Sequence, residues 1–187
     1  MAPLKVYTDR LILRIENSEI ADKVLAFYIK NAISFEKYEP TRPEDFYTLE
    51  YHQEALTGEL SLYDMGSFVR YYIYTQDDPD IIVGALNFNV KYDADRAFVE
   101  IGYKIDSDYR NLGIVTEAVK KGMQIMHDHY GIERFDMRIL PNNYPSKKVA
   151  KKLGFEPVEF EPQSANVLGK QVDVMRFRHF WGENDIL

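Results

Sequence analysis

The chain opens with two segments whose apolar residues recur at different periods. Residues 8–15 alternate apolar and polar side chains, with Leu11 and Leu13 on one face, and this alternation predicts a strand. Residues 18–30 then carry apolar side chains at helical spacing. The pattern therefore predicts a strand followed by a first helix.

A connection without periodicity follows the first helix. Residues 35–43 are aromatic and charged and show no regular spacing. Thr41 and Glu44 then have the spacing of a capping box, ahead of further apolar residues. This predicts a second helix that ends near residue 59.

The middle of the chain changes to the alternating pattern of strands. β-Branched and aromatic residues dominate there, and acidic turn-like residues divide the segments at 77–80 and 93–95. Gly102 interrupts the last segment, which indicates either a bulge or a close backbone approach. The three predicted antiparallel strands span residues 68–75, 81–91 and 97–105.

The last third alternates between helical and extended patterns. An apolar stripe begins at residue 114 and predicts a long helix that ends near Gly131. The remaining predicted elements are a strand at 134–140, a short helix at 146–153 ended by Gly154, and strands at 155–160 and 167–177 around Gly169. Strands and helices mixed in this way predict a fold of the α/β (α+β) class.

Length and composition restrict the kind of protein. A chain of 187 residues suits one domain, here residues 1–187, and we expect a monomer or a homodimer. No apolar run approaches the roughly 18 residues of a membrane span and no signal-peptide pattern begins the chain, so we expect a cytoplasmic protein without membrane contact. The sequence has no cysteine, and its four histidines form no metal motif, so we expect no metal.

The net charge of −7 limits the partners. Nucleic-acid binding needs a basic surface, so we expect no nucleic acid. An amine partner suits an acidic protein better, although a local basic patch still allows an anionic cofactor.

The segment Arg110 to Ala118 lies between an extended apolar segment and the long helix. Gly113 lets the backbone approach a ligand, and the free N–H groups that open a helix attract anions. Taken alone, one glycine before a helix is more often an ordinary loop. The neighbouring motifs decide between a loop and a phosphate site.

Four motifs, in this order, resemble those of the GNAT superfamily of acetyl-CoA-dependent N-acetyltransferases. They are most similar to the branch that includes the ribosomal-protein N-terminal acetyltransferases. The motifs are Thr8 to Arg14, Glu100 to Tyr103, Arg110 to Ala118, and Asn143 to Phe155. The resemblance covers nearly the whole chain.

This resemblance implies a fold and a cofactor site. The implied fold is a mixed, mostly antiparallel sheet of about seven strands with about four helices, splayed between the fourth and fifth strands. The implied co-substrate is acetyl-CoA, whose pyrophosphate binds the backbone amides of the loop. The cofactor-binding residues are expected to be Tyr103, Lys104, Ile105, Arg110, Asn111, Leu112, Gly113, Ile114, Val115, Thr116, Asn143 and Ser146.

Val115 departs from the family pattern, which has glycine or alanine at this place. A β-branched side chain at a close backbone approach could weaken or shift cofactor binding, but backbone amides rather than side chains hold the phosphates. Arg110 and several lysines of residues 147–152 make the flanks basic. Each lysine is either a phosphate ligand or part of a solvated helix face.

The resemblance also implies direct attack by the amine in a ternary complex, with backbone N–H groups near residues 102–104 holding the thioester oxygen. We expect Glu100 to accept the proton, directly or through water, although a structural glutamate is the alternative. Ser146 is the expected acid for the thiolate and also a possible helix cap. Asn143 is expected to contact the cofactor, and Tyr144 is a weaker substitute for the acid.

The acceptor amine is expected between the first-helix connection and the C-terminal hairpin. Phe35, Glu36, Tyr38 and Glu39 offer ring faces and carboxylates to a cation, although core aromatics with solvated acids are the alternative. The implied acceptors are a protein N-terminus, a polyamine, an aminoglycoside or another small amine.

Two further functions compete with the transferase. A binding module would hold acyl-CoA without transfer, and Val115 and the absence of the tyrosine acid common in the superfamily favour it. A nucleotide-phosphate hydrolase lacks both the P-loop lysine and a metal-binding acidic strand end. We therefore expect an N-acetyltransferase, with the binding module as the alternative.

Overall fold

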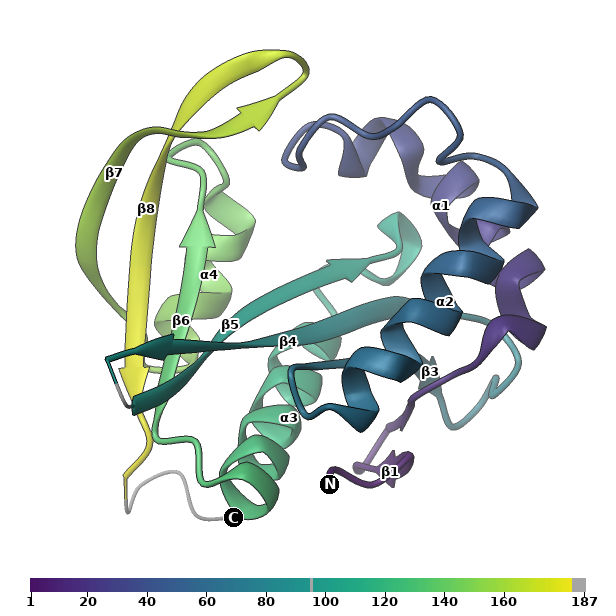
Figure 1. The fold of residues 1–187 in the computed structure, drawn as a ribbon, viewed down its shortest axis with the longest axis horizontal. Coiled ribbons are helices and arrows are strands. Elements are labelled where there is room, and N and C mark those ends of the chain that lie inside the picture. The colour runs from purple at the N-terminus through teal and green to yellow at the C-terminus, as the bar shows by residue number, and fades with distance from the viewer. Residues whose placement is uncertain (95, 183–187) are drawn as a thin grey trace.

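A computed structural model describes residues 1–94 and 96–182 of the chain, built around one sheet (Figure 1). Its eight strands follow the spatial order β1-β2-β3-β4-β5-β6-β8-β7. The strands are β1 (Lys5–Tyr7), β2 (Leu11–Arg14), β3 (Phe68–Thr75), β4 (Gly84–Asp93), β5 (Arg96–Ile105), β6 (Arg134–Ile139), β7 (Glu156–Val167) and β8 (Lys170–Phe180). The α-helices are α1 (Ala21–Phe35), α2 (Leu49–Asp64), α3 (Ile114–Tyr130) and α4 (Tyr144–Lys152).

The helices lie on both faces of the sheet and form two apolar clusters. On one face, α3 and α4 pack against residues such as Leu13, Tyr71 and Phe88. On the other face, α1 and α2 pack against residues such as Tyr72 and Tyr74. The alternation of side chains along β2 and β3 sends neighbouring residues to opposite clusters, as the sequence pattern predicts.

The sheet divides between β5 and β6. Every other described strand pair is antiparallel, but β5 and β6 are parallel and share only the pairs Val99↔Phe135 and Glu100↔Asp136. β5 then continues to Ile105 beside β4 alone, and Figure 1 shows β5 and β6 diverging. The sequence predicted the splay between the fourth and fifth strands, which correspond to β5 and β6. The numbers differ by one because β1 was not among the predicted strands.

Several predicted elements near the N-terminus have different limits in the structure. The strand predicted at 8–15 starts later, at Leu11, and β1 precedes it. Helix α1 extends to Phe35, so this residue belongs to a helix rather than to the connection. The predicted cap at Thr41 is wrong, because Thr48 caps α2 by accepting a hydrogen bond from the N–H of Tyr51.

Other limits differ less. The strand expected from residue 81 begins at Gly84, and no bulge interrupts the register of β4 and β5 at Gly102. The C-terminal strands are longer than expected and turn at Leu168 and Gly169, both with positive φ. Part of the turn predicted at 93–95 falls on Asp95, which lies outside the described residues.

Over residues 1–94 and 96–182, no helix combines the length and apolar character needed to cross a bilayer. The same residues contain no group of three or more histidine, cysteine, aspartate or glutamate side chains placed to hold a metal ion.

Candidate functional site

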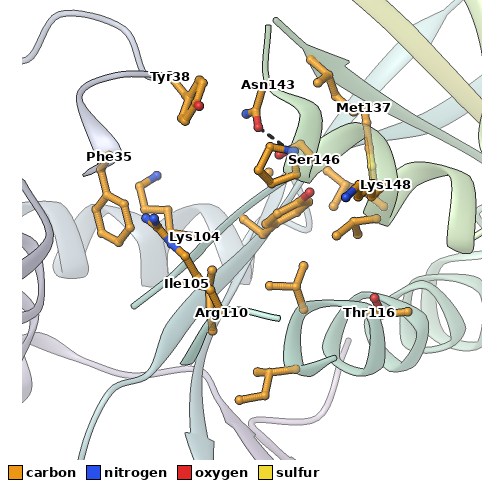
Figure 2. A pocket seen from close by; sticks show the side chains of 18 of the residues that line it. Phe35, Tyr38, Lys104, Ile105, Arg110, Thr116, Met137, Asn143, Ser146 and Lys148 are labelled. Atoms are coloured by element: carbon orange, nitrogen blue, oxygen red, sulfur yellow. Dashed lines mark hydrogen bonds between the residues drawn. The ribbon is translucent and has the colours of Figure 1, made fainter. Parts of the chain in front are cut away.

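A cavity of about 670 Å³ occupies the region where β5 and β6 separate. Its walls come from the end of α1, from β5 and β6, from the start of α3 and from α4. Figure 2 shows Phe35, Tyr38 and Lys104 on one side of this space and Ser146 and Lys148 on the other. Segments far apart in sequence therefore meet at the splay.

The start of α3 forms the floor of the cavity with its backbone. Asn111 and Gly113 both have positive φ, of 62° and 79°, and this turns the loop into the helix. Asparagine and glycine are the residues that tolerate this conformation best. The N–H of Glu117 donates to the carbonyl of Gly113 at 3.1 Å, so the preceding N–H groups of the first turn have no carbonyl partner within the helix. Such free N–H groups, at the positive end of a long helix, favour an anion.

Val115 lies in this first turn, and its side chain packs into the apolar cluster between α3 and the sheet. It is 8% exposed. The β-branched side chain therefore contributes to the core.

Arg10 fixes the same loop from a distant part of the chain. Its guanidinium donates to the Leu112 carbonyl at 2.9 Å and to Glu117 Oε2 at 2.7 Å. The Thr8 hydroxyl donates to Glu117 Oε1 at 2.6 Å. Burial disfavours the charge of Glu117, but the hydrogen bonds from Thr8 and Arg10 hold its pKa below the usual value. The sequence motif Thr8 to Arg14 thus holds in place the loop that precedes α3.

β5 supplies the wall above the loop. At Gly102, a Cβ atom would lie 2.9 Å from the side-chain oxygen of Asn87 on the paired strand. The close approach that the sequence indicated at Gly102 is therefore made by a side chain of β4. The Tyr103 hydroxyl is buried and has no hydrogen-bond partner among the described residues. Burial raises the pKa of Tyr103 to about 12, and the nearby Ser146 opposes part of this rise.

Helix α4 forms the opposite wall. Asn143 caps it by accepting a hydrogen bond from the N–H of Ser146 at 3.2 Å, as the dashed line in Figure 2 shows. The cap is therefore Asn143, and the Ser146 hydroxyl is not needed for this role. Lys148 and Lys152 line the cavity one helical turn apart, whereas Lys147 donates to the carbonyl of Pro141.

The connection between α1 and α2 closes the side of the cavity where the sequence predicted the acceptor. Glu39 makes ion pairs of 3.0 Å with both Lys104 and Arg42. The connection also touches the tip of the β7–β8 hairpin, where Pro40 bridges Val167 and the Thr41 hydroxyl accepts the N–H of Gly169. These contacts join the two segments between which the sequence predicted the acceptor.

The structure brings most of the predicted site residues together and leaves four outside the cavity. Glu100 is half-buried on β5, Leu112 and Tyr144 are exposed, and Glu36 instead accepts a hydrogen bond from Tyr47 at 2.5 Å. The predicted residues that line the cavity are Phe35, Tyr38, Glu39, Tyr103, Lys104, Ile105, Arg110, Asn111, Gly113, Ile114, Val115, Thr116, Asn143 and Ser146.

Sequence analysis missed several lining residues. Met137, Arg138 and Ile139 come from β6, which the alternating pattern predicted as a strand without indicating which ligand it faces. Asn87 could not be found, because it reaches Gly102 across a strand pair whose register only the fold defines.

The cavity lies where β5 and β6 diverge and extends from the start of α3 to the end of α1 and the α1–α2 connection. Residues 10–156 match the model of the protein family described as acetyltransferase (GNAT) domain, so the chain belongs to this family. The family resemblance found in the sequence is therefore confirmed, and with it the class of enzyme.

Curated relatives and solved structures are consistent with this family. The chain is 25% identical over 153 residues to the [ribosomal protein uS5]-alanine N-acetyltransferase of Escherichia coli, covering 82% of this chain and 78% of the relative. The ribosomal-protein-S5-alanine acetyltransferase structure from Vibrio fischeri superposes with a TM-score of 0.87 at 20% identity, covering 97% and 98% of the two chains. Mycobacterium smegmatis RimJ in complex with CoA-disulfide gives a TM-score of 0.82 at 21% identity, covering 91% of this chain and 81% of that chain.

Proposed function

We propose that this protein transfers the acetyl group of acetyl-CoA to a primary amine, by direct attack within a ternary complex. The observation that carries the proposal is that one cavity joins the free amides of α3 to the α1–α2 connection. A donor can enter from the first side and an acceptor from the second. The acetyltransferase family and the relatives' names support the reaction.

Acetyl-CoA would lie with its pyrophosphate at the start of α3. The amides of the first helical turn would bind the phosphate oxygens, with Arg110 and Lys148 nearby on the cavity wall. The thioester would reach the part of β5 beyond Glu100, where the strand has no register with β6 among the described residues. Backbone N–H groups on this open edge would stabilise the oxyanion.

The proposed base is Glu100, acting through water because it does not line the cavity. Glu39 does line it, but its carboxylate is already engaged in ion pairs with Arg42 and Lys104. We therefore assign Glu39 to the acceptor side, where it would orient the incoming ammonium group together with Tyr38.

The thiolate needs a proton, and two hydroxyl groups are candidates. Ser146 lines the cavity and is free of the capping role. Tyr103 adds a buried hydroxyl, which the raised pKa of about 12 keeps protonated at neutral pH. We propose Ser146 as the acid, with the buried hydroxyl of Tyr103 nearby.

Among amines, we propose the α-amine of a polypeptide N-terminus as the acceptor. The relatives named as ribosomal-protein alanine acetyltransferases support this choice. An α-amine in a flexible peptide has a pKa of about 8, against about 10.4 for a lysine side chain, so it is neutral more often at physiological pH.

Two measurements test the proposal. Calorimetry should detect stoichiometric binding of acetyl-CoA, and release of free thiol should accompany addition of peptides but not of N-acetylated peptides. Glu100→Gln and Ser146→Ala should each lower turnover by about a hundredfold, and Glu100→Gln should leave cofactor binding intact. Cofactor binding without thiol release across peptides, polyamines and aminoglycosides would instead support an acyl-CoA-binding module, and absence of cofactor binding would refute both.

A further inference from the structure

A second cavity, of about 260 Å³, lies beside the first under the α1–α2 connection. It is bounded by this connection, by α2 and by the face of β3 and β5 that α1 and α2 cover. Glu39 and Lys104 line both cavities. The two spaces therefore meet at this ion pair, on the acceptor side of the proposed reaction site.

The second cavity contains more positive than negative side chains. Arg42, Arg70 and Lys104 line it, together with the carboxylates of Glu39 and Glu59. Glu39 pairs with both Arg42 and Lys104, and Glu59 pairs with Arg70 at 2.6 Å. Burial raises the pKa of Glu59, and the nearby Arg70 and Lys104 lower it only in part. The balance of charge thus favours an anion and disfavours a cation.

Unpartnered nitrogen atoms indicate which kind of atom is missing. The Nε atoms of Arg42 and Arg70 are buried and have no hydrogen-bond partner among the described residues. A guanidinium Nε–H can only donate. The Arg42 side chain is 8% exposed, so bulk water has little access to it. Two buried donors in one cavity require an acceptor oxygen.

The remaining walls suit an aliphatic stem. The rings of Tyr28, Phe46 and Tyr72 line the cavity, and the Arg42 guanidinium lies 4.2 Å from the centre of the Phe46 ring. His52 also lines the cavity, and its Nε2 atom is buried without a described partner. Aromatic rings beside charged donors suit a short acidic side chain or a small amino acid.

We infer that the second cavity binds a carboxylate of the acceptor while the acceptor's amine lies in the first cavity. The inference rests on the proposed transferase function and adds a substrate class to it. A neutral amide of the same shape has only one oxygen and no charge for the two arginines. A side-chain carboxylate of a peptide and the α-carboxylate of a free amino acid offer the same chemistry.

A binding experiment separates these sources without requiring turnover. The probes are three isosteric products, each titrated into the CoA-bound protein: N-acetyl-glutamic acid α-amide, N-acetyl-glutamine and N-acetyl-glutamine amide. The first has only a side-chain carboxylate, the second only an α-carboxylate, and the third has neither. At least one acid should bind about tenfold more tightly than the diamide. Equal affinities for all three, or no detectable binding of either acid, would mean a water-filled cavity and overturn the inference.

Turnover then tests the residues. The ratio of kcat/KM for an acidic acceptor to that for its amide is measured on one protein sample, so loss of folded protein does not alter it. Arg42→Gln, and separately Arg70→Gln combined with Glu59→Gln, should bring this ratio close to one. Arg14→Gln is the matched control, because Arg14 also has a buried unpartnered Nε but lines neither cavity. A ratio that persists in both cavity variants overturns the inference, whereas failure of all acceptors, acidic or not, would count against the transferase itself.

Discussion

Strands β3 and β8 bury their residues very differently, although both are central to their half of the sheet. Six of the eight residues of β3 are buried, against two of the eleven in β8. In β2, β3 and β4, both faces lie under helices and both contribute to apolar clusters. In β6, one face carries apolar residues and the other carries charged ones, and Arg176 and Arg178 of β8 pair with Asp136 on the charged face.

Asp136 is the centre of this charged face. It is 0% exposed and accepts hydrogen bonds from Arg134, Arg176 and Arg178. It also belongs to the last residue pair between β5 and β6 before the strands diverge. Few strand pairs join the halves, which share instead one apolar cluster with α3. The first half relies on apolar burial and the second half depends partly on charge.

The largest expected effect is on this charged face. Asp136→Asn would leave three arginines without their shared carboxylate, and we expect the free energy of unfolding to fall by about 3 kcal/mol. Denaturant unfolding measures it. Glu159→Gln is the control, because Glu159 also pairs with Arg176 but is 60% exposed and should change little. Equal losses in both variants would remove the distinction between the two halves.

Lowering the pH should also show that the stability of the protein depends on the charge of Asp136. Burial opposes the charge of Asp136, but hydrogen bonds from Arg178 and Arg134 hold its pKa at about 2, below the ordinary aspartate value of 3.8. The stability gained is therefore complete above the unfolded pKa and is lost as the pH falls through the folded one, by roughly 2 kcal/mol in all. As the pH falls from 5 to about 2, the free energies of unfolding of wild type and Asp136→Asn should therefore converge. A constant difference between the two free energies over this pH range would contradict the low pKa of Asp136.

The next effect concerns the loop at the start of α3. Glu117→Gln would weaken the hydrogen bonds from Thr8 and Arg10 that fix this loop, and we expect acetyl-CoA affinity to fall about tenfold. Calorimetry measures it. Asp128→Asn, an exposed change on the same helix, should leave the affinity unaltered. Unchanged binding in Glu117→Gln would show that the loop keeps its shape without the support of Arg10.

A smaller effect is expected from the glycines at the two ends of α3. Gly113 and Gly131 have φ of 79° and 64°, so alanine at either should cost about 1 kcal/mol of stability. Only Gly113→Ala should also weaken acetyl-CoA, because only that end faces the cavity. Thermal unfolding and calorimetry on both variants separate strain from binding.

The smallest effect is expected at Val115. Its side chain packs into the core beneath the loop, so Val115→Ala should leave acetyl-CoA affinity unchanged. A clear gain in affinity would show that the β-branched side chain hinders the cofactor, as the departure from the family pattern could imply.

Sequence analysis found the elements that depend on local pattern. β3 has the predicted limits, and α3 follows the predicted apolar stripe to Gly131, because periodicity and a glycine cap are encoded by neighbouring residues. The cap of α2 was misplaced because Thr41 has the right spacing, whereas its hydroxyl is used by the β7–β8 turn. A tertiary contact decided this case.

The candidate site shows the same contrast between features that neighbouring residues encode and features that tertiary contacts decide. The loop that opens α3 was predictable because one short motif forms it, whereas its binding of an anion stays a prediction. The second cavity was not predictable, because Arg42, Glu59, Arg70 and Lys104 come from four segments that only the folded sheet brings together. Glu100 is the opposite case. Its place in a motif indicated a catalytic role, but it does not line the cavity, so its role as the base stays a prediction.

The support of the loop by Arg10 also affects the order in which the protein is assembled. Arg10 and Glu117 are 107 residues apart, and contacts of such long range form late in folding. During synthesis the N-terminal segment leaves the ribosome long before α3 exists. The loop is therefore completed by residues that are made well before it, and a nascent chain should gain affinity for acetyl-CoA only after α3 has emerged and the strand that begins at Leu11 has joined the sheet.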